Sequence, residues 1–517
     1  MIRASFRRHR LMALVALSTL LSTTAVVSAA HDWTSPPVGP AAPRAAAWSG
    51  TLWAGPQSGA PLAPQAADCA RPPQAIDLAG PEVPAVAQAR RETRGVLAAA
   101  PAVAPLPAPA PARRAEALSD REATKSSPAP VGAAGLAAPA APAAPAATLP
   151  MLLERRTMNE AIAARPTPMT ATPVTAGVID DNADFGEYRA FRQRHAQLPV
   201  RHRDVSERYL LTVHDASGRV VPDAQVTLHA GGQPRPLWAR TDAGGQVWLH
   251  PKAVGLNDSV LEVQVRKPAP DGELRGSALL RRGQRDALQV RLDANAPVEG
   301  ARLDLVFLVD ATGSMADEID KLRNSMLAMA EQIGRLPSKP QICFGLVAYR
   351  DRGDEFFVRA HDFTNDLGAF QQVLGGLQAG GGGDYPEALN EALHTAVHRL
   401  SWRGQGATRL VVLVADAPPH LDYGQPWYDD DMQGALARGI KLFAVGASGL
   451  ERTGEYVFRQ MAQYTGGRFV FLTYADARNP SSGPGRETTH DVGNYSVETL
   501  DKLVVRLVKE ELARRPA

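Results

Sequence analysis

The sequence predicts three parts of different fold class. These are a flexible N-terminal region, an all-β domain, and a C-terminal α/β domain on a doubly wound, mainly parallel sheet. Residues 31–150 consist largely of Ala and Pro, which bury too little apolar surface to offset the entropy of ordering the chain. Residues 205–295 contain short runs in which apolar and polar residues alternate. From residue 301 onward, uninterrupted apolar runs are separated by helical stretches, which is typical of a sheet buried on both faces.

The first 30 residues have the pattern of a cleaved secretory signal. A basic stretch, "MIRASFRRHR", precedes the apolar run "LMALVALSTLLSTTAVV" and the small residues "VSAA". We therefore expect an exported protein, either periplasmic or secreted. An uncleaved membrane anchor is the alternative, because the apolar run approaches spanning length. Since no second run of that kind follows, no transmembrane helix is expected in the mature chain.

Residues 31–150 are predicted to be a disordered spacer with polyproline II character, and residues 151–204 a short helical and linker segment. The two cysteines of the chain are Cys69, within the spacer, and Cys343, in the apolar run "QICFGLVAY". We expect no bridge between them, and we expect Cys343 to behave as a small core residue.

Residues 205–295 are predicted to form a β-sandwich. The runs "YLLTVHD", "AQVTLHA", "GQVWLH", "VLEVQVR" and "ALQVRL" are separated by turn clusters rich in Asp and Gly. The string "VHDASGRVVPDAQVTLHAGG…ARTDAGGQVWLH" resembles the carboxypeptidase-regulatory-like and related immunoglobulin-like modules. That resemblance implies a fold and says little about function.

Residues 301–475 are predicted to form the α/β domain, and residues 476–517 a loop and a closing amphipathic helix, "VETLDKLVVRLVKEEL". The expected parallel strands are "LDLVFLVD", "ICFGLVAY", "TRLVVLVAD" and "IKLFAVGA". In such a sheet, ligands bind beyond the carboxyl ends of the strands, where the strand order reverses.

Oxygen-bearing side chains follow these predicted strands. Asp310, Thr312 and Ser314 follow the first strand, Asp384 opens a helix after "AGGGG", and Asp416 ends the run "TRLVVLVAD". These hard donors suit Mg²⁺ best, with Mn²⁺ or Ca²⁺ as alternatives. No cluster of His or Cys in the sequence indicates a softer metal. The competing interpretation is that Thr312 or Ser314 caps a helix beginning at residue 315.

The motifs "DATGSM", "VAYRDRGDEF", "GGGGDYPEAL", "DAPPH" and "MAQYTGGRF" resemble the von Willebrand factor type A domain with its metal-ion-dependent adhesion site. The D-x-S-x-S signature of that family is present as D-A-T-G-S. The resemblance implies that Thr312 and Ser314 coordinate the metal directly, whereas Asp310 and Asp416 act largely through water. The third-loop position, often threonine in the family, corresponds here to Gly383 or Asp384, and we assign it to Asp384.

The resemblance implies a non-catalytic protein that binds a protein partner, or mediates adhesion, through the metal face of the domain. A carboxylate at residue 384 would lower the positive charge of the metal and weaken its attraction for an acidic ligand. The formal net charge of +2 gives no electrostatic reason to expect nucleic acid as a partner.

Two other functions remain open. Asp310 in D-A-T-G-S is also placed as the nucleophile of a Mg²⁺-dependent phosphotransferase would be, although the first-loop lysine of such enzymes is absent. The metal could instead be purely structural, in an envelope-assembly protein. Two short motifs offer further alternatives: the tripeptide Arg352-Gly353-Asp354 matches an integrin-recognition sequence, and the acidic run in "WYDDDM" could hold a second metal, although it also suits a helix N-terminus.

Overall fold

The computed structural model describes residues 69–80, 173–231, 236–383 and 385–516. The predicted signal, most of the predicted spacer and the predicted helix near residue 151 lie outside these residues, as does Asp384. No helix in the described ranges is both long and apolar enough to cross a membrane.

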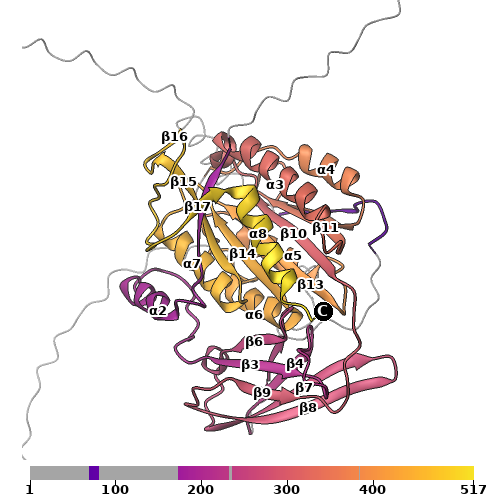
Figure 1. Cartoon of the computed structure of the whole chain (residues 1–517). Helices are drawn as coiled ribbons and strands as arrows, with labels where there is room; N and C mark the ends of the chain where they lie inside the picture. The colour runs from indigo at the N-terminus through magenta and orange to yellow at the C-terminus, as the bar shows by residue number, and fades with distance from the viewer. Residues whose placement is uncertain (1–68, 81–172, 232–235, 384, 517) are drawn as a thin grey trace, which may run out of the picture. The chain divides into compact units, whose positions relative to one another are not determined.

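A ten-stranded mixed sheet forms the centre of the α/β part (Figure 1). Its order is β1-β12-β11-β10-β13-β14-β15-β2-β17, and β16 pairs with β15. The strands are β1 (Ala75–Leu78), β2 (Thr175–Ile179), β10 (Arg302–Asp310), β11 (Gln341–Tyr349), β12 (Val358–Thr364), β13 (Ala407–Ala415), β14 (Ile440–Gly446), β15 (Arg468–Asp476), β16 (Asn479–Pro484) and β17 (Val497–Thr499). The central run β11-β10-β13-β14-β15 is parallel, and it includes the four strands predicted from apolar runs.

Helices cover both faces of this sheet because its strands are apolar on both sides. Along β10, Leu305 and Phe307 belong to one hydrophobic cluster, whereas Val306 and Leu308 belong to the other. The first cluster includes residues of α3 (Ile319–Gly334), α4 (Leu367–Gly375) and α8 (Leu500–Ala513). The second includes residues of α5 (Leu389–His398), α6 (Tyr428–Arg438) and α7 (Arg452–Tyr464).

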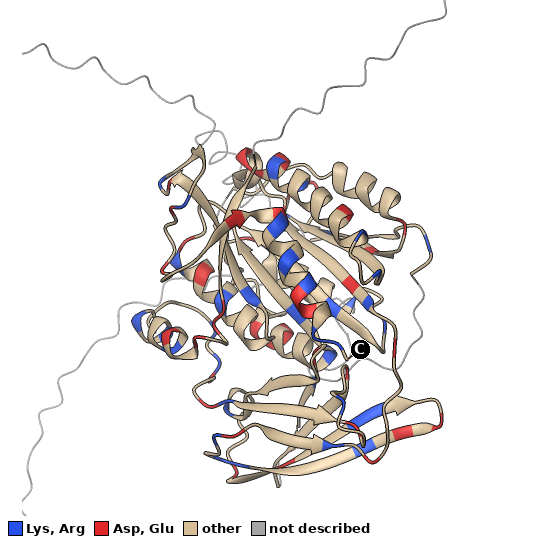
Figure 2. Ribbon diagram, in the orientation of Figure 1, with Lys and Arg blue, Asp and Glu red and all other residues tan. Residues whose placement is uncertain are grey.

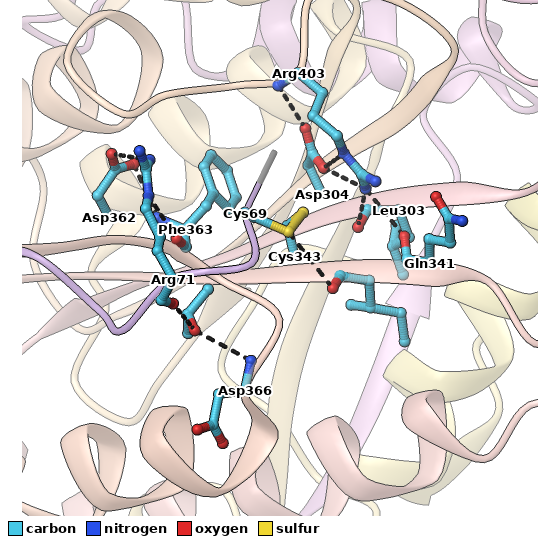
Figure 3. The surroundings of a disulfide bond; sticks show 12 residues. Cys69, Arg71, Leu303, Asp304, Gln341, Cys343, Asp362, Phe363, Asp366 and Arg403 are labelled. Atoms are coloured by element: carbon cyan, nitrogen blue, oxygen red, sulfur yellow. Dashed lines mark hydrogen bonds and ion pairs between the residues drawn. A yellow bond between two sulfur atoms is a disulfide. The ribbon is translucent and has the colours of Figure 1, made fainter. Parts of the chain in front are cut away.

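The segment around Cys69 differs from the predicted spacer. Cys69 and Cys343 form a disulfide with a Cα–Cα distance of 6.0 Å, so the expectation of two unbridged cysteines was wrong. Beyond it, β1 pairs antiparallel with β12 at the sheet edge. Arg71 also reaches Asp362, with a 2.7 Å ion pair (Figure 3). These contacts order a short part of an Ala/Pro-rich region, because they supply the backbone partners and buried surface that the segment lacks alone.

The predicted linker segment also contributes to the sheet. β2 inserts between β15 and β17, antiparallel to both. It is followed by α2 (Phe185–Arg194), which Asp184 caps by accepting from the backbone N–H of Glu187. The buried rings of Tyr188 and Phe191 anchor α2 to the second hydrophobic cluster.

Residues 205–295 form two further sheets. One has the order β6-β3-β9 and the other β5-β4-β7-β8. Their elements are β3 (Tyr209–His214), β4 (Gln225–His229), β5 (Leu237–Arg240), β6 (Gln246–Leu249), η2 (Pro251–Val254), β7 (Val260–Ala269), β8 (Gly272–Arg281) and β9 (Leu288–Arg291). Buried residues of both sheets, such as Leu211 and Val263, belong to one hydrophobic cluster. The proposed kinship to carboxypeptidase-regulatory-like modules stays a prediction.

Acidic and basic side chains are interspersed along the chain. Figure 2 shows both signs together on α8, for example. This mixture agrees with the small formal net charge of +2.

Candidate metal centre

Two of the predicted site loops follow the carboxyl ends of two adjacent parallel strands. β10 ends at Asp310, and β13, its direct neighbour, ends at Ala415, one residue before Asp416. The chain continues from β10 to β11 on one side, while β13 lies on the other. This edge is therefore the point where strand order reverses, as predicted.

The first loop folds back on Asp310 instead of capping a helix. Thr312 donates to Asp310 Oδ1 twice, from its hydroxyl at 2.6 Å and from its backbone N–H at 3.0 Å. Ser314 Oγ lies 3.1 Å from Thr312 Oγ1. Neither hydroxyl caps the short 3-10 helix η3 (Gly313–Asp317), and α3 begins only at Ile319. The capping alternative is therefore wrong. The hydroxyl of Thr312 binds the Asp310 carboxylate, and the hydroxyl of Ser314 lies next to that of Thr312.

Asp310 and Asp416 are buried carboxylates that the described residues satisfy only in part. Asp310 is 0 % and Asp416 5 % exposed. Within the described ranges, Asp310 Oδ2 and Asp416 Oδ1 have no hydrogen-bond partner. Such atoms are costly to bury unless another group neutralises them.

The raised pKa values of Asp310 and Asp416 also indicate that a positive charge close to them would stabilise their ionised forms. Burial, and then the neighbouring Asp416, raise the pKa of Asp310 to about 7. Burial also raises the pKa of Asp416 to about 6, against the opposing effect of a hydrogen bond from Ser314. Two carboxylates that resist ionisation in one place are what a divalent cation would stabilise.

The glycine-rich loop at residues 380–383 is the third loop that borders the site. Gly313 N–H donates to Gly381 O at 3.0 Å, which joins this loop to the first. Gly382 has φ +74°, and a Cβ there would lie 3.0 Å from Glu387 Oε1 and 3.3 Å from Thr312 Cβ. Glycine is therefore required at residue 382 for both backbone conformation and space. Asp384 comes two residues after Gly382 but lies outside the described residues, so its assignment stays a prediction.

Sequence reasoning missed Glu387 and Tyr349 as members of this site. Glu387 is 3 % exposed, and its carboxylate lies beside Gly382, as does Thr312. Tyr349 is the ladder partner of Asp310. Burial, followed by Asp310, Asp416 and Glu387, raises its pKa well above the ordinary value. Glu387 was in the quoted motif "GGGGDYPEAL", but a glutamate near a helix start is too common to indicate a ligand.

The backbone of Glu387 also joins two of the site loops. Its N–H donates to Pro418 O at 3.1 Å, and its carbonyl accepts from the N–H of His420 at 3.1 Å. The loop after β13 is thereby tied to the segment that precedes α5. Asp310, Asp416 and Glu387 thus come from loops held together by direct backbone contacts.

The Arg352-Gly353-Asp354 tripeptide contributes to the framework of the site. Asp354 Oδ2 accepts from the N–H of Gly382 at 2.7 Å and from that of Asp351 at 2.9 Å. The guanidinium of Arg352 lies 3.5 Å from the ring centroid of Tyr423. Both charged side chains are thus engaged within the domain, which argues against the tripeptide as a projecting recognition loop.

The donor set fits a hard divalent cation. It consists of two hydroxyls and buried carboxylates, with carboxylate oxygens that need a positive partner, and Ser314 lies on the exposed side. The structure places Asp310, Thr312, Ser314 and Asp416 close together, and their role as metal ligands stays a prediction.

Comparison with known families identifies this domain. Residues 304–478 match the family model of the von Willebrand factor type A domain. The sheet extends beyond the matched residues, because β1, β2, β16 and β17 lie outside them.

Two curated proteins resemble part of the chain. The alpha-protein kinase vwkA of Dictyostelium discoideum is 29% identical over 161 residues, which cover 30% of this chain and 24% of the relative. A putative ariadne-like RING finger protein, R811, of Acanthamoeba polyphaga mimivirus is 30% identical over 120 residues, which cover 23% of this chain and 11% of the relative. The chain spans about a quarter or less of these relatives.

Among solved structures, two crystal structures of the pilus adhesin SpaC of Lactobacillus rhamnosus GG are similar to part of this chain. One covers 40% of this chain and 29% of the adhesin, with 13% identity and a TM-score of 0.26. The other, an open conformation, covers 47% and 30%, with 14% identity and a TM-score of 0.26.

Proposed function

We propose that the type A domain binds a divalent cation, Mg²⁺ in the first place, between its strand-end loops and uses the metal face to bind a protein partner without catalysis. The observation that carries the proposal is the pair Asp310 and Asp416. They leave adjacent strands, are buried together, and each retains a carboxylate oxygen without a hydrogen-bond partner in the described chain. Thr312 and Ser314 supply the hydroxyls next to them.

The charge of the site shapes the proposed partner. Asp310, Asp416 and Glu387 together outweigh the charge of one divalent cation, and Asp384 would add to the imbalance. A carboxylate from a partner would therefore be attracted less strongly than to a site built mainly from hydroxyls. A neutral oxygen donor, such as a backbone carbonyl or a side-chain amide, is the contacting group that this electrostatics favours.

Export is part of the proposal. Its support is the N-terminal pattern of basic, apolar and small residues together with the Cys69–Cys343 disulfide. Disulfides persist mainly in oxidising compartments such as the periplasm or the extracellular space. A disulfide that joins the predicted spacer to the type A domain is consistent with folding after translocation.

Isothermal titration of Mg²⁺ and Mn²⁺ into the full chain tests the metal. We expect saturable binding that Asp310→Ala abolishes and that Asp320→Asn leaves unchanged, because Asp320 is an exposed acid on α3 paired with Arg323. Loss of binding in Asp384→Ala as well would assign the third-loop ligand to Asp384. If Asp384→Ala binds normally, Glu387 becomes the candidate for that role. Absence of saturable binding by the wild type would refute the metal centre.

Partner binding and catalysis need separate measurements. Capture of a partner should require Mg²⁺, be reversed by chelation, and be lost in Asp310→Ala but retained in Asp320→Asn. Capture that survives both chelation and Asp310→Ala would place the interaction elsewhere. Turnover of a phosphate monoester that depends on Asp310 would overturn the non-catalytic proposal in favour of the phosphotransferase alternative.

A further inference from the structure

Two helices on one face of the sheet bring a second set of metal-ligand side chains together. His394 and His398 are one turn apart on α5, and Asp431 lies in the first turn of α6. His394 Nδ1 is 3.0 Å and His398 Nε2 2.8 Å from the same atom, Asp431 Oδ1. The expectation that no histidine cluster exists for a softer metal is corrected by this arrangement.

The cluster is built into the core. The side chains of His398 and Asp431 are 1 % and 2 % exposed, whereas that of His394 is 13 % exposed. The imidazole rings stack with their centroids 4.5 Å apart. A Cβ on Gly434 would lie 3.0 Å from both Cε1 and Nε2 of His398, so the glycine leaves room beside the nitrogen that faces Asp431.

Hydrogen bonding alone accounts for this cluster poorly. Both ring nitrogens are directed at one carboxylate oxygen. The other oxygen, Asp431 Oδ2, and the second ring nitrogen of His398, Nδ1, have no hydrogen-bond partner among the residues that the structure describes. A buried anion with one oxygen shared and the other unsatisfied is costly unless a cation is close.

The dimensions fit a tetrahedral ion. One ligand atom from each residue lies within 4.8 Å of the other two. A tetrahedral zinc ion with bonds of about 2.0–2.1 Å separates its ligand atoms by roughly 3.3 Å. The two nitrogen–oxygen separations, 2.8 and 3.0 Å, need to open by only a few tenths of an ångström.

We propose that His394, His398 and Asp431 form a binding site for a borderline transition-metal ion, Zn²⁺ in the first place. Two imidazoles and one carboxylate are a donor set that zinc prefers, and histidines four residues apart on a helix present their rings on one face. In tetrahedral coordination the three protein ligands leave a fourth position for water. This chemistry differs from the all-oxygen set at the strand ends.

The metal would connect two helices that carry the loops of the strand-end site. Near their N-termini the same helices are already joined by Asn390, whose Oδ1 accepts from the N–H of Tyr428 at 2.8 Å. α5 begins two residues after Glu387, and α6 follows the loop that begins at Asp416. The metal at His394, His398 and Asp431 would add a second connection at least one helical turn further along α5.

Titration of the tag-free full chain with Co²⁺, in saturating Mg²⁺, tests the site. Visible d–d absorption reports coordination by nitrogen and oxygen, and Zn²⁺ should displace the signal because it occupies the same donor set. We expect one equivalent to bind to the wild type. His394→Gln and Asp431→Asn should each weaken binding at least tenfold, because even substitutions of outer-shell partners have effects of about that size.

Two control variants separate this site from others. Asp430→Asn removes the neighbouring acid, which pairs instead with Arg203, and should bind Co²⁺ as the wild type does. Asp310→Asn should also keep the signal, because it alters only the strand-end loops. Failure of the proposed Mg²⁺ site would therefore leave this result intact.

The outcomes decide the proposal. Binding that neither His394→Gln nor Asp431→Asn weakens would overturn it, as would a wild type that binds no Co²⁺ or Zn²⁺ at micromolar free metal. Circular dichroism establishes whether each variant folds. If Asp431→Asn does not fold, His394→Gln decides alone, since His394 is the most exposed of the three. X-ray absorption of the zinc-loaded chain should then show nitrogen and oxygen neighbours at about 2.0–2.1 Å.

Discussion

Replacement of Asp310 by asparagine should stabilise the metal-free protein and abolish binding at the proposed Mg²⁺ site. The folded state raises the pKa of this carboxyl to about 7 from the ordinary value of 3.8, through burial and then the charge of Asp416. A carboxyl whose pKa rises on folding binds its proton more tightly in the folded state. The stability that it contributes is present at low pH and is lost as the pH rises from the unfolded pKa through the folded one. Asparagine is isosteric and carries no charge to bury.

The shift sets the size of the effect. At about pH 8, keeping Asp310 ionised next to Asp416 costs the folded chain roughly 4 kcal/mol, because each pKa unit corresponds to about 1.4 kcal/mol. At about pH 5.5, Asp310 is protonated in the folded state, and the penalty is smaller by about 2 kcal/mol. In the Asp310→Asn variant, the amide oxygen would still accept from the hydroxyl and N–H of Thr312, so the first loop keeps its anchor.

The assay is denaturant unfolding of both proteins in EDTA at the two pH values, with Asp320→Asn as the matched control. Asp310→Asn should exceed the wild type in free energy of unfolding at the higher pH, by up to a few kcal/mol, and its advantage should shrink by about 2 kcal/mol at the lower pH. Mg²⁺ should reverse the order at high pH, because only the wild type binds it. An asparagine variant that is less stable than the wild type in EDTA at both pH values would refute the reasoning.

Three further outcomes follow. Because protons compete with the metal for Asp310, the Mg²⁺ affinity measured by titration calorimetry should fall roughly 30-fold from about pH 8 to about pH 5.5, and a pH-independent affinity would contradict a pKa near 7. Cys69→Ser should lower the free energy of unfolding by about 2–4 kcal/mol in denaturant titrations, and fully reduced wild type should match it; equal stability of variant and oxidised wild type would contradict a structural bridge. Gly382→Ala should destabilise the chain by about 1 kcal/mol or more and weaken Mg²⁺ binding, because φ is +74° and the new Cβ would crowd Glu387. Gly375→Ala, with open space around the added carbon, is its control, and equal effects of the two would contradict the crowding.

Local sequence patterns were enough to predict most strands of the α/β domain. An uninterrupted apolar run marks a strand with helices on both faces, and β10, β11, β13 and β14 lie where such runs predicted them. The same runs predicted where Asp310 and Asp416 lie, because a polar residue directly after a buried strand lies at the carboxyl end of that strand. That Asp310 and Asp416 lie next to each other was inferred only from the fold class. The structure shows the reason, which is that β10 and β13 are adjacent parallel strands.

Segments with weak local preference were predicted poorly. β1 and β2 are only 4 and 5 residues long and border regions rich in Ala and Pro, so their own sequences give only a weak strand signal. Each gains its conformation by pairing with a neighbouring strand, β12 or β15, which offers backbone donors and acceptors. The disulfide escaped prediction for a related reason. Its cysteines are 274 residues apart, and only the docking of the segment near Cys69 brings them within bonding distance.

By itself, the sequence determined the strands of the parallel sheet, the loop after β10 with its two hydroxyls, and the acidic residue that follows β13. These features depend on neighbours within a few positions, where side-chain period and composition act directly. Only the tertiary structure decided that Glu387 and Thr312 both lie beside Gly382, that Cys69 bonds Cys343, and that His398 of α5 contacts Asp431 of α6. Such contacts depend on how separate elements pack, and packing is specified by the whole core rather than by any local run of residues.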